Sequence, residues 1–176
     1  MGRKQIHAGS VVDLGLETVD LPGGERIELE VVRHVGAAAV LPVLESDEVV
    51  LVRQFRHATG GWLLEAPAGK RDPGEDPRRC ALRETEEETG MRAGRLHELG
   101  WIWTTPGFCD EKIWLYLATD LKPGEQKLES DEVLSLVTLP FGEALLQAQR
   151  GEIVDAKTLC LLLRADALRR RSNGSA

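Results

Sequence analysis

The sequence predicts an α/β fold, an α-β-α sandwich built around a central mixed sheet and preceded by an N-terminal β-hairpin. Three observations predict it. The 176 residues, 42% of them hydrophobic and 29% charged, are enough for one domain with a full hydrophobic core. Segments with strand and helix patterns are mixed along the chain instead of being grouped, which favours an α/β architecture. The chain also has no internal repeat.

The predicted hairpin occupies residues 11–34, where apolar and polar side chains alternate on both sides of the turn Leu21-Pro22-Gly23-Gly24. Such a hairpin has an apolar face that needs a cover, which is either the body of the domain or a second protomer. We therefore divide the chain into a hairpin segment at 1–35, one domain at 36–170 and a flexible tail at 171–176.

The body of the chain is predicted from patterning and turn residues. A helix should begin near Asp76, with Pro77 in its first turn, and end at a glycine C-cap at Gly90. Trp62, Trp101 and Trp103 could form a platform for adenine, but a tryptophan in an alternating strand is more often a core residue, and we expect that here. Apolar runs between turns predict strands at 36–43, 49–55, 62–64, 96–104, 113–119 and 133–139, and two further helices at 141–149 and 156–170.

Bulk composition limits the partners of the protein. The formal net charge of -7 makes a nucleic-acid backbone an unfavourable partner, although a divalent metal could bridge an acidic protein and a polyanion. The three cysteines are widely spaced, so neither a disulfide framework nor a zinc site is expected. No apolar signal core or membrane-length apolar run is present, which predicts a cytoplasmic, soluble protein without a membrane partner.

An unusually acidic segment lies near the end of the first predicted helix. On a helix, Glu84, Glu87 and Glu88 project from the same side because they are three and four residues apart. Their mutual repulsion disfavours a bare helix, and a hard cation such as Mg²⁺ or Mn²⁺ would remove that cost. Arg83, four residues before Glu87, can neutralise one carboxylate. The alternative is an ordinary solvated, charge-rich helix face.

The surroundings of these glutamates favour the metal-binding interpretation. Residues 69–91 resemble the Nudix box, the loop–helix–loop signature of the Nudix hydrolase superfamily. Thr85 departs from the pattern because an aliphatic residue is usual there, and we expect slightly looser docking of the helix. The positions that match the pattern are Gly69, Glu75, Arg83, Glu84, Glu87, Glu88, Gly90 and Met91.

The resemblance implies a Nudix-type sandwich and a role for each matching residue. Two or three Mg²⁺ or Mn²⁺ ions would bridge a pyrophosphate, withdraw charge from it and activate a water. Glu84 and Glu88 would be the principal metal ligands, and the carbonyl of Ala68 a further one. Glu87 would complete the cluster or hold a metal-bound water, while Glu75 and Arg83 would hold the glutamates in place.

Segments outside the box resemble one branch of the superfamily. The loop 104–111 is similar to the proline-containing loop of enzymes that act on ADP-ribose and nucleoside diphosphate sugars, and the segments 52–56, 62–69 and 151–158 are also similar to that branch. This implies hydrolysis of ADP-ribose to AMP and ribose 5-phosphate. Alternatives are GDP-mannose, another nucleoside diphosphate sugar or FAD. A remote alternative is a non-catalytic module that binds ADP-ribose, which would be expected to lack box glutamates.

Substrate contacts and a general base are predicted with alternatives left open. In the loop, Pro106 and Gly107 would contact the substrate. Arg56 could clamp phosphate oxygens, or form a surface ion pair. Glu65 and Glu111 could contact ribose hydroxyls or the metal-bound water, or form structural ion pairs.

In the branch that this chain resembles, the general base commonly comes from the flexible loop before the last strand, which is residues 125–132 here. We favour Glu132, with Glu129 in reserve; the alternative is an ordinary acidic surface loop. The resemblance further implies a homodimer in which the N-terminal hairpin exchanges with its partner and helps to form the substrate site.

Overall fold

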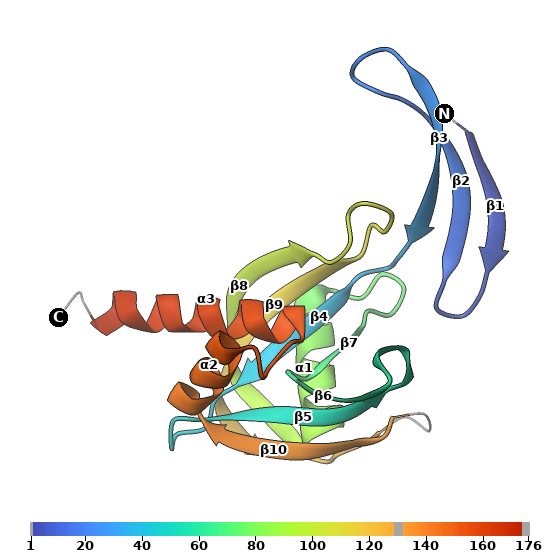
Figure 1. Ribbon diagram of the computed structural model, residues 1–176. Helices are drawn as coiled ribbons and strands as arrows, with labels where there is room; N and C mark the ends of the chain where they lie inside the picture. Colours follow the sequence, from blue (N-terminus) through green and yellow to red (C-terminus); the bar gives the residue numbers. More distant parts are fainter. Residues whose placement is uncertain (1, 129–131, 174–176) are drawn as a thin grey trace.

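The computed structural model describes residues 2–128 and 132–173. An N-terminal sheet of three antiparallel strands stands away from the rest of the chain (Figure 1). Its strands are β1 (Gly2–Ala8), β2 (Asp13–Asp20) and β3 (Arg26–Arg33). The predicted hairpin is therefore confirmed as β2–β3, and β1 extends it by a strand that the sequence pattern did not predict.

The body contains a four-stranded mixed sheet in the order β7-β4-β9-β8. β4 (Ala37–Pro42) runs parallel to β9 (Lys112–Pro123) and antiparallel to the short β7 (Ala68–Lys70). β8 (Met91–Trp103) pairs antiparallel with β9. The predicted α/β fold with a central mixed sheet is confirmed.

A second, antiparallel sheet lies beside the mixed sheet, in the order β10-β5-β6. β5 (Glu48–Arg56) is its central strand, between β10 (Leu134–Pro140) and β6 (Gly61–Glu65). A short 3-10 helix, η1 (His57–Thr59), connects β5 to β6.

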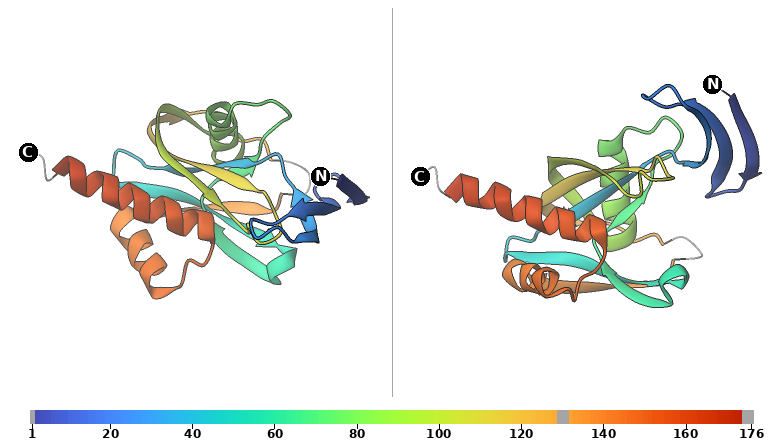
Figure 2. Two further views of the ribbon diagram at one scale, coloured as in Figure 1. Left: turned by 90° about the horizontal axis from the view of Figure 1, so that it is seen from above. Right: turned by 45° about the horizontal axis from the view of Figure 1, so that its top comes forward.

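Helices cover both faces of the mixed sheet (Figure 2, left). α1 (Pro77–Thr89) packs on the face that carries Ala38 and Val40. α3 (Ala156–Asn173) packs on the face that carries Ala39 and Leu41, and α2 (Phe141–Arg150) packs against α3, β5 and β10. Because side chains alternate along a strand, β4 supplies both cores, and its small alanines let the helices approach closely.

The expectation that three tryptophans are core residues is wrong. Trp62, Trp101 and Trp103 are 47%, 43% and 47% exposed. Cations cover part of this aromatic surface, such as Lys112, whose Nζ lies 4.0 Å from the Trp101 ring centroid.

α3 continues through residue 173, and an ion pair between Arg170 and Asp166 joins two of its turns. The flexible tail at 171–176 stays a prediction. Residues 174–176 lie outside the described residues.

Candidate active site

The site is built on α1, whose ends are those that the sequence predicts. The Asp76 side chain caps the N-terminus by accepting hydrogen bonds from the backbone N–H groups of Arg78 and Arg79, and Pro77 occupies the first turn. At the other end Gly90 adopts the left-handed conformation, with φ at 67°. Both caps are local, and they fix which helix face the glutamates share.

The glutamates of α1 divide by burial. Glu84 is 6% and Glu88 2% exposed, while the side chain of Glu87 is 36% exposed. One oxygen of Glu88, Oε2, accepts a hydrogen bond of 3.2 Å from the backbone N–H of Ala68. The departure from the family pattern at Thr85 does not loosen the helix, because Thr85 is fully buried and its hydroxyl donates to the Ala81 carbonyl.

Gly69 lies directly against the Glu84 carboxylate. A Cβ at this position would lie 1.9 Å from Oε1 and 2.0 Å from Cδ of Glu84, which no side chain allows. β7 therefore holds a glycine where the backbone and a buried carboxylate approach each other.

Arg83 connects the carboxylates of the loop and of the helix. Its Nη1 donates to Oε1 of Glu84 at 2.7 Å and to Oε2 of Glu87 at 2.9 Å. Its Nε and Nη2 donate to Glu75 at 3.1 and 3.0 Å. The predicted pairing of Arg83 with Glu87 is confirmed, and the same guanidinium also binds Glu75 and Glu84.

Burial and neighbouring charges give these carboxyl groups different pKa values. Burial, with the charges of Glu84 and Glu132, raises the pKa of Glu88 to about 8. Burial also raises the pKa of Glu84 to about 7, although Arg83 opposes this. The hydrogen bond from Arg83 lowers the pKa of Glu75 to about 2. The two buried carboxylates thus sit where a nearby positive charge would strongly favour their ionised form.

A cavity of about 240 Å³ opens beside these carboxylates. Two of the predicted metal ligands, Glu84 and Glu87, line it together with Glu132, the predicted base. The charge of Glu132 contributes to the raised pKa values of Glu84 and Glu88, so its carboxylate lies near both. The full lining is Gly69, Lys70, Asp72, Arg83, Glu84, Glu87, Lys127 and Glu132.

The loop that carries Lys127 is fastened to the C-terminal end of α1. The backbone N–H of Lys127 donates to the Glu87 carbonyl at 2.8 Å, and the Gln126 side chain donates to the Glu88 carbonyl at 2.7 Å. These bonds satisfy carbonyls that a helix end leaves without partners. Sequence reasoning missed Lys127, because nothing local indicates that this loop returns to α1.

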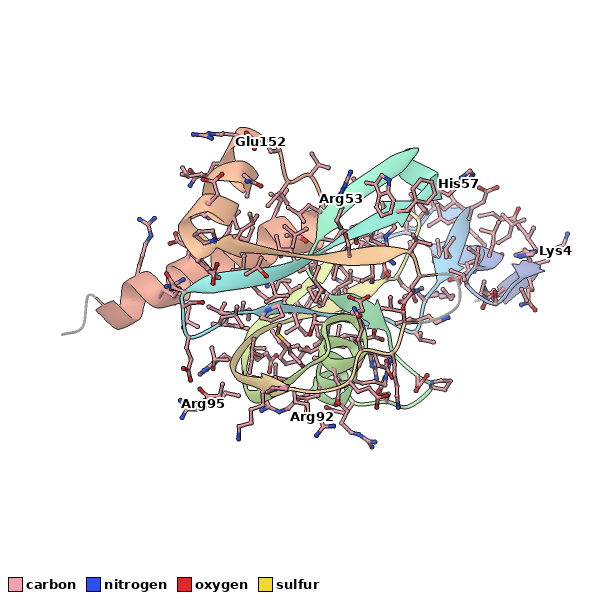
Figure 3. The ribbon with its side chains drawn as sticks, turned by 90° about the horizontal axis from the view of Figure 1, so that it is seen from below. Lys4, Arg53, His57, Arg92, Arg95 and Glu152 are labelled. Carbon is pink, nitrogen blue, oxygen red and sulfur yellow. The ribbon has the colours of Figure 1, made fainter. Side chains whose placement is uncertain are left out.

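Arg56 and Glu65 form an ion pair in which only the carboxylate is buried. The Nε and Nη2 atoms of Arg56 each lie 2.9 Å from a Glu65 oxygen, and Glu65 is only 2% exposed. The Arg56 side chain is 40% exposed. The alternative of a structural ion pair is thus present for Glu65. Figure 3 shows Arg53 and His57, the neighbours of Arg56 along the chain, at the surface.

The loop 104–111 is joined to β3 and does not line the described cavity. The backbone N–H of Val32 donates to the Phe108 carbonyl at 2.7 Å, and Asp110 accepts from the His34 N–H at 2.7 Å. Pro106 and Gly107 are exposed. Glu111 lies 3.5 Å from Nδ1 of His34, and the Gly36 N–H also lies within hydrogen-bond distance of that nitrogen.

Residues 2–128 and 132–173 hold neither a ready-made cation site nor a membrane-spanning helix. No group of three His, Cys, Asp or Glu side chains forms a ready-made cation site there. Arg83 contacts Glu84 and Glu87, so their carboxylates would have to turn from it to meet a cation. Over the same residues, none of the helices combines the length and the hydrophobicity that a membrane crossing requires.

The raised pKa values predict how stability depends on pH in protein treated with a chelator. The folded state keeps protons on Glu84 and Glu88 that the unfolded chain releases near 4.5, so folding takes up protons up to about pH 8. The free energy of unfolding should therefore fall as pH rises from about 5 to about 8. Urea unfolding at several pH values measures this. A free energy that rises across this range would contradict it.

Comparison with known proteins identifies a matching family model and several relatives in sequence. The family model described as the NUDIX domain matches residues 32–162. The chain is 40% identical over 160 residues to the ADP-ribose pyrophosphatase of Bacillus subtilis (strain 168), covering 90% of this chain and 86% of that protein. It is 42% identical to the methanol dehydrogenase activator of Bacillus methanolicus, over 89% and 85% of the two chains. It is 39% identical to the GDP-mannose pyrophosphatase of Cronobacter sakazakii, over 76% and 78%.

A solved structure shares the fold. The crystal structure of an ADP compounds hydrolase superposes with a TM-score of 0.84, covering 98% of this chain and 94% of that chain. The sequence identity is 22%, so the likeness concerns the fold. It includes the N-terminal sheet, because so little of this chain is left unmatched.

Proposed function

Because the chain belongs to the Nudix family, we propose that it hydrolyses the pyrophosphate bond of a nucleoside diphosphate linked to a sugar, with ADP-ribose the preferred substrate. One observation carries the proposal: Glu84 and Glu87 of α1 and Glu132, from a distant loop, line one cavity. Water is added across the P–O–P bond, so ADP-ribose yields AMP and ribose 5-phosphate. The relative from Bacillus subtilis, an ADP-ribose pyrophosphatase, supports this substrate.

The carboxylates suit a hard divalent cation. Their donors are oxygens, which Mg²⁺ and Mn²⁺ prefer. The carboxylates of Glu84 and Glu88 are buried and have raised pKa values. The missing side chain of Gly69 leaves space for the Glu84 carboxylate. We propose Glu84, Glu87, Glu88 and the Ala68 carbonyl as ligands of two or three Mg²⁺ or Mn²⁺ ions. When bound, the metal would neutralise phosphate charge and lower the pKa of a water.

The protein's own groups would then handle the proton and the substrate. Glu132 would take the proton from the attacking water, because its carboxylate lies close to the cluster. Arg56, with Nε and Nη2 held by Glu65, would offer its remaining N–H groups to phosphate oxygens. Roles for Glu65, Pro106, Gly107 and Glu111 as substrate contacts stay predictions, and the reserve base Glu129 lies outside the described residues.

A second substrate class has support of its own. The relative from Cronobacter sakazakii is a GDP-mannose pyrophosphatase, so GDP-mannose is the leading alternative. A panel of ADP-ribose, GDP-mannose, other nucleoside diphosphate sugars and FAD, assayed with Mg²⁺ for release of nucleoside monophosphate, tests the proposal. Release of AMP from ADP-ribose with the highest kcat/KM supports it. Binding of ADP-ribose without any hydrolysis would instead favour the non-catalytic module.

Replacing Glu132 by glutamine should lower kcat by about 10²–10⁴-fold, because that is what a positioned general base contributes. Glutamine keeps the shape of the side chain but cannot take a proton. Affinity for Mg²⁺, measured by calorimetry, should stay close to that of the wild type. An unchanged kcat would move the base role to Glu129 or Glu87.

We also propose a homodimer in which the N-terminal sheet meets a partner. The sheet projects from the body (Figure 1), and Ile6, Val12 and Leu29 on its strands or turn are 50%, 42% and 41% exposed. Exposed apolar residues grouped on one element favour an interface. A cytoplasmic location stays a prediction. Sedimentation at assay concentration tests the assembly, and a monomer would refute it.

A further inference from the structure

The segment 151–158, which the proposed function leaves without a role, forms a buried network of charges at the start of α3. Nζ of Lys157 contacts Oε2 of Glu65 and lies 2.9 Å from Oδ1 of Asp155. The Lys157 side chain is only 12% exposed. Such a buried ammonium is costly unless it is paired on several sides, and here two carboxylates pair it.

The network continues from α3 into the strand before the box. Oδ2 of Asp155 accepts hydrogen bonds from the N–H and the hydroxyl of Thr158, at 2.9 and 2.5 Å. The Thr158 hydroxyl oxygen in turn accepts from the Ala66 N–H at 2.7 Å, and Thr158 is fully buried. The start of α3 is thereby fixed to the segment between Glu65 and the box.

Glu65 is the point where this network meets Arg56. Burial alone would raise the pKa of Glu65, but the hydrogen bond from Arg56 and the charge of Lys157 together lower it. The carboxylate is therefore a buried anion that two cations share. Its position, and with it the orientation of the bidentate Arg56 guanidinium, depends on both.

We propose that Lys157 is a positioning residue that acts through Glu65 to orient Arg56 toward the phosphates of the substrate. The inference rests on the proposed function, which gives Arg56 its phosphate contact. Without Lys157, Arg56 would be the one cation left on the Glu65 carboxylate among the described residues, and the pair would be free to tilt as a unit. The consequence falls on substrate binding, since neither Lys157 nor Glu65 carries out the chemical step.

Kinetics of Lys157→Met and Lys157→Arg test the proposal. Methionine keeps the packing of the stem and removes the charge, so KM for ADP-ribose should rise about tenfold while kcat stays within about twofold. Arginine restores the charge and should bring KM back to within about threefold of the wild type. The affinity for ADP-ribose, measured by calorimetry in the presence of a chelator, should fall in the order wild type, Lys157→Arg, Lys157→Met. An unchanged KM, or a fall in kcat alone, would overturn the proposal.

A double-mutant cycle with Glu65→Gln separates positioning from simple stabilisation. Glutamine removes the Glu65 charge, so the double variant has no Glu65 carboxylate that has lost Lys157, and it tests the idea even if Lys157→Met alone fails to fold. If Lys157 acts through Glu65, adding Lys157→Met to Glu65→Gln should leave KM unchanged within about twofold. A further tenfold rise in KM would mean that Lys157 acts independently of Glu65, and would contradict the proposal.

Arg53→Met is the matched control for this cycle. Arg53 lies on the same strand as Arg56, but its Cζ lies 5.2 Å from the Trp62 ring centroid, at the surface in Figure 3. The change in KM that Arg53→Met causes should simply add to the change that Lys157→Met causes. The activity of the wild type on the substrate panel is measured first. An inactive wild type refutes the proposed function, whereas an active wild type with an unaltered Lys157→Met refutes only the role of Lys157.

Discussion

Replacing Glu88 by glutamine is expected to abolish hydrolysis and to leave the fold intact. Glu88 is 2% exposed and its pKa is raised to about 8, so the carboxylate is buried where a bound cation would strongly favour its charged form. A bound metal contributes several kcal/mol to stabilisation of the transition state, and each ~1.4 kcal/mol is a factor of ten, so kcat should fall by about 10²–10³-fold or more.

The stability of the Glu88→Gln variant gives a second measurement. Glutamine removes a buried acid that disfavours folding above about pH 5, so the metal-free variant should melt no lower than the wild type at pH 8. The fall in unfolding free energy between about pH 5 and pH 8 should also become shallower. Glu86→Gln on the same helix is the control, because Glu86 is half-buried and paired with Arg92. Wild-type turnover in Glu88→Gln would remove the metal-cluster mechanism.

Substituting alanine for Gly69 should have the next largest effect. The new methyl group would occupy a position 1.9 Å from Oε1 of Glu84, so the carboxylate must move. A displacement of about 1 Å in a catalytic constellation can cost about 100-fold in rate, and we expect kcat to fall by about that factor. Affinity for Mg²⁺ should fall as well, because Glu84 is a proposed ligand.

Folding of the Gly69→Ala variant should be little affected, since the clash involves the far end of a side chain. The melting temperature should therefore stay close to that of the wild type. Gly61→Ala is the matched control, because a Cβ there meets no atom within 4 Å. If Gly69→Ala keeps both its kcat and its affinity for Mg²⁺, the proposed place of Glu84 in the site is wrong.

Predictions from the sequence succeeded where the signal is local. The ends of α1 follow from Asp76, Pro77 and Gly90, and each acts within one turn of the helix. The apolar run at residues 36–43 predicted a strand, and β4 is buried along its whole length. The strand β7 was missed because its three residues carry no pattern, and it exists only because β4 offers an edge with which it pairs.

The site shows the same division. Burial of Glu84 and Glu88 agrees with the helix face that their spacing defines. In contrast, Lys127 reaches the cavity because its loop binds the end of α1, and the spacing of residues gives no sign of that. The expectation that Trp101 lies in the core failed for a similar reason. An alternating strand shows which side chains share a face, but not which part of that face a helix covers.

The sequence by itself determined the chemistry of this protein. The spacing from Gly69 to Met91 sets the glutamates on one side of a capped helix, because helical periodicity is a property of the chain alone. Only the tertiary structure decided which residues from elsewhere join them. Glu65 is held between Arg56 and Lys157, across 92 residues of sequence in the case of Lys157. Such contacts depend on packing of the whole core, which no local pattern encodes.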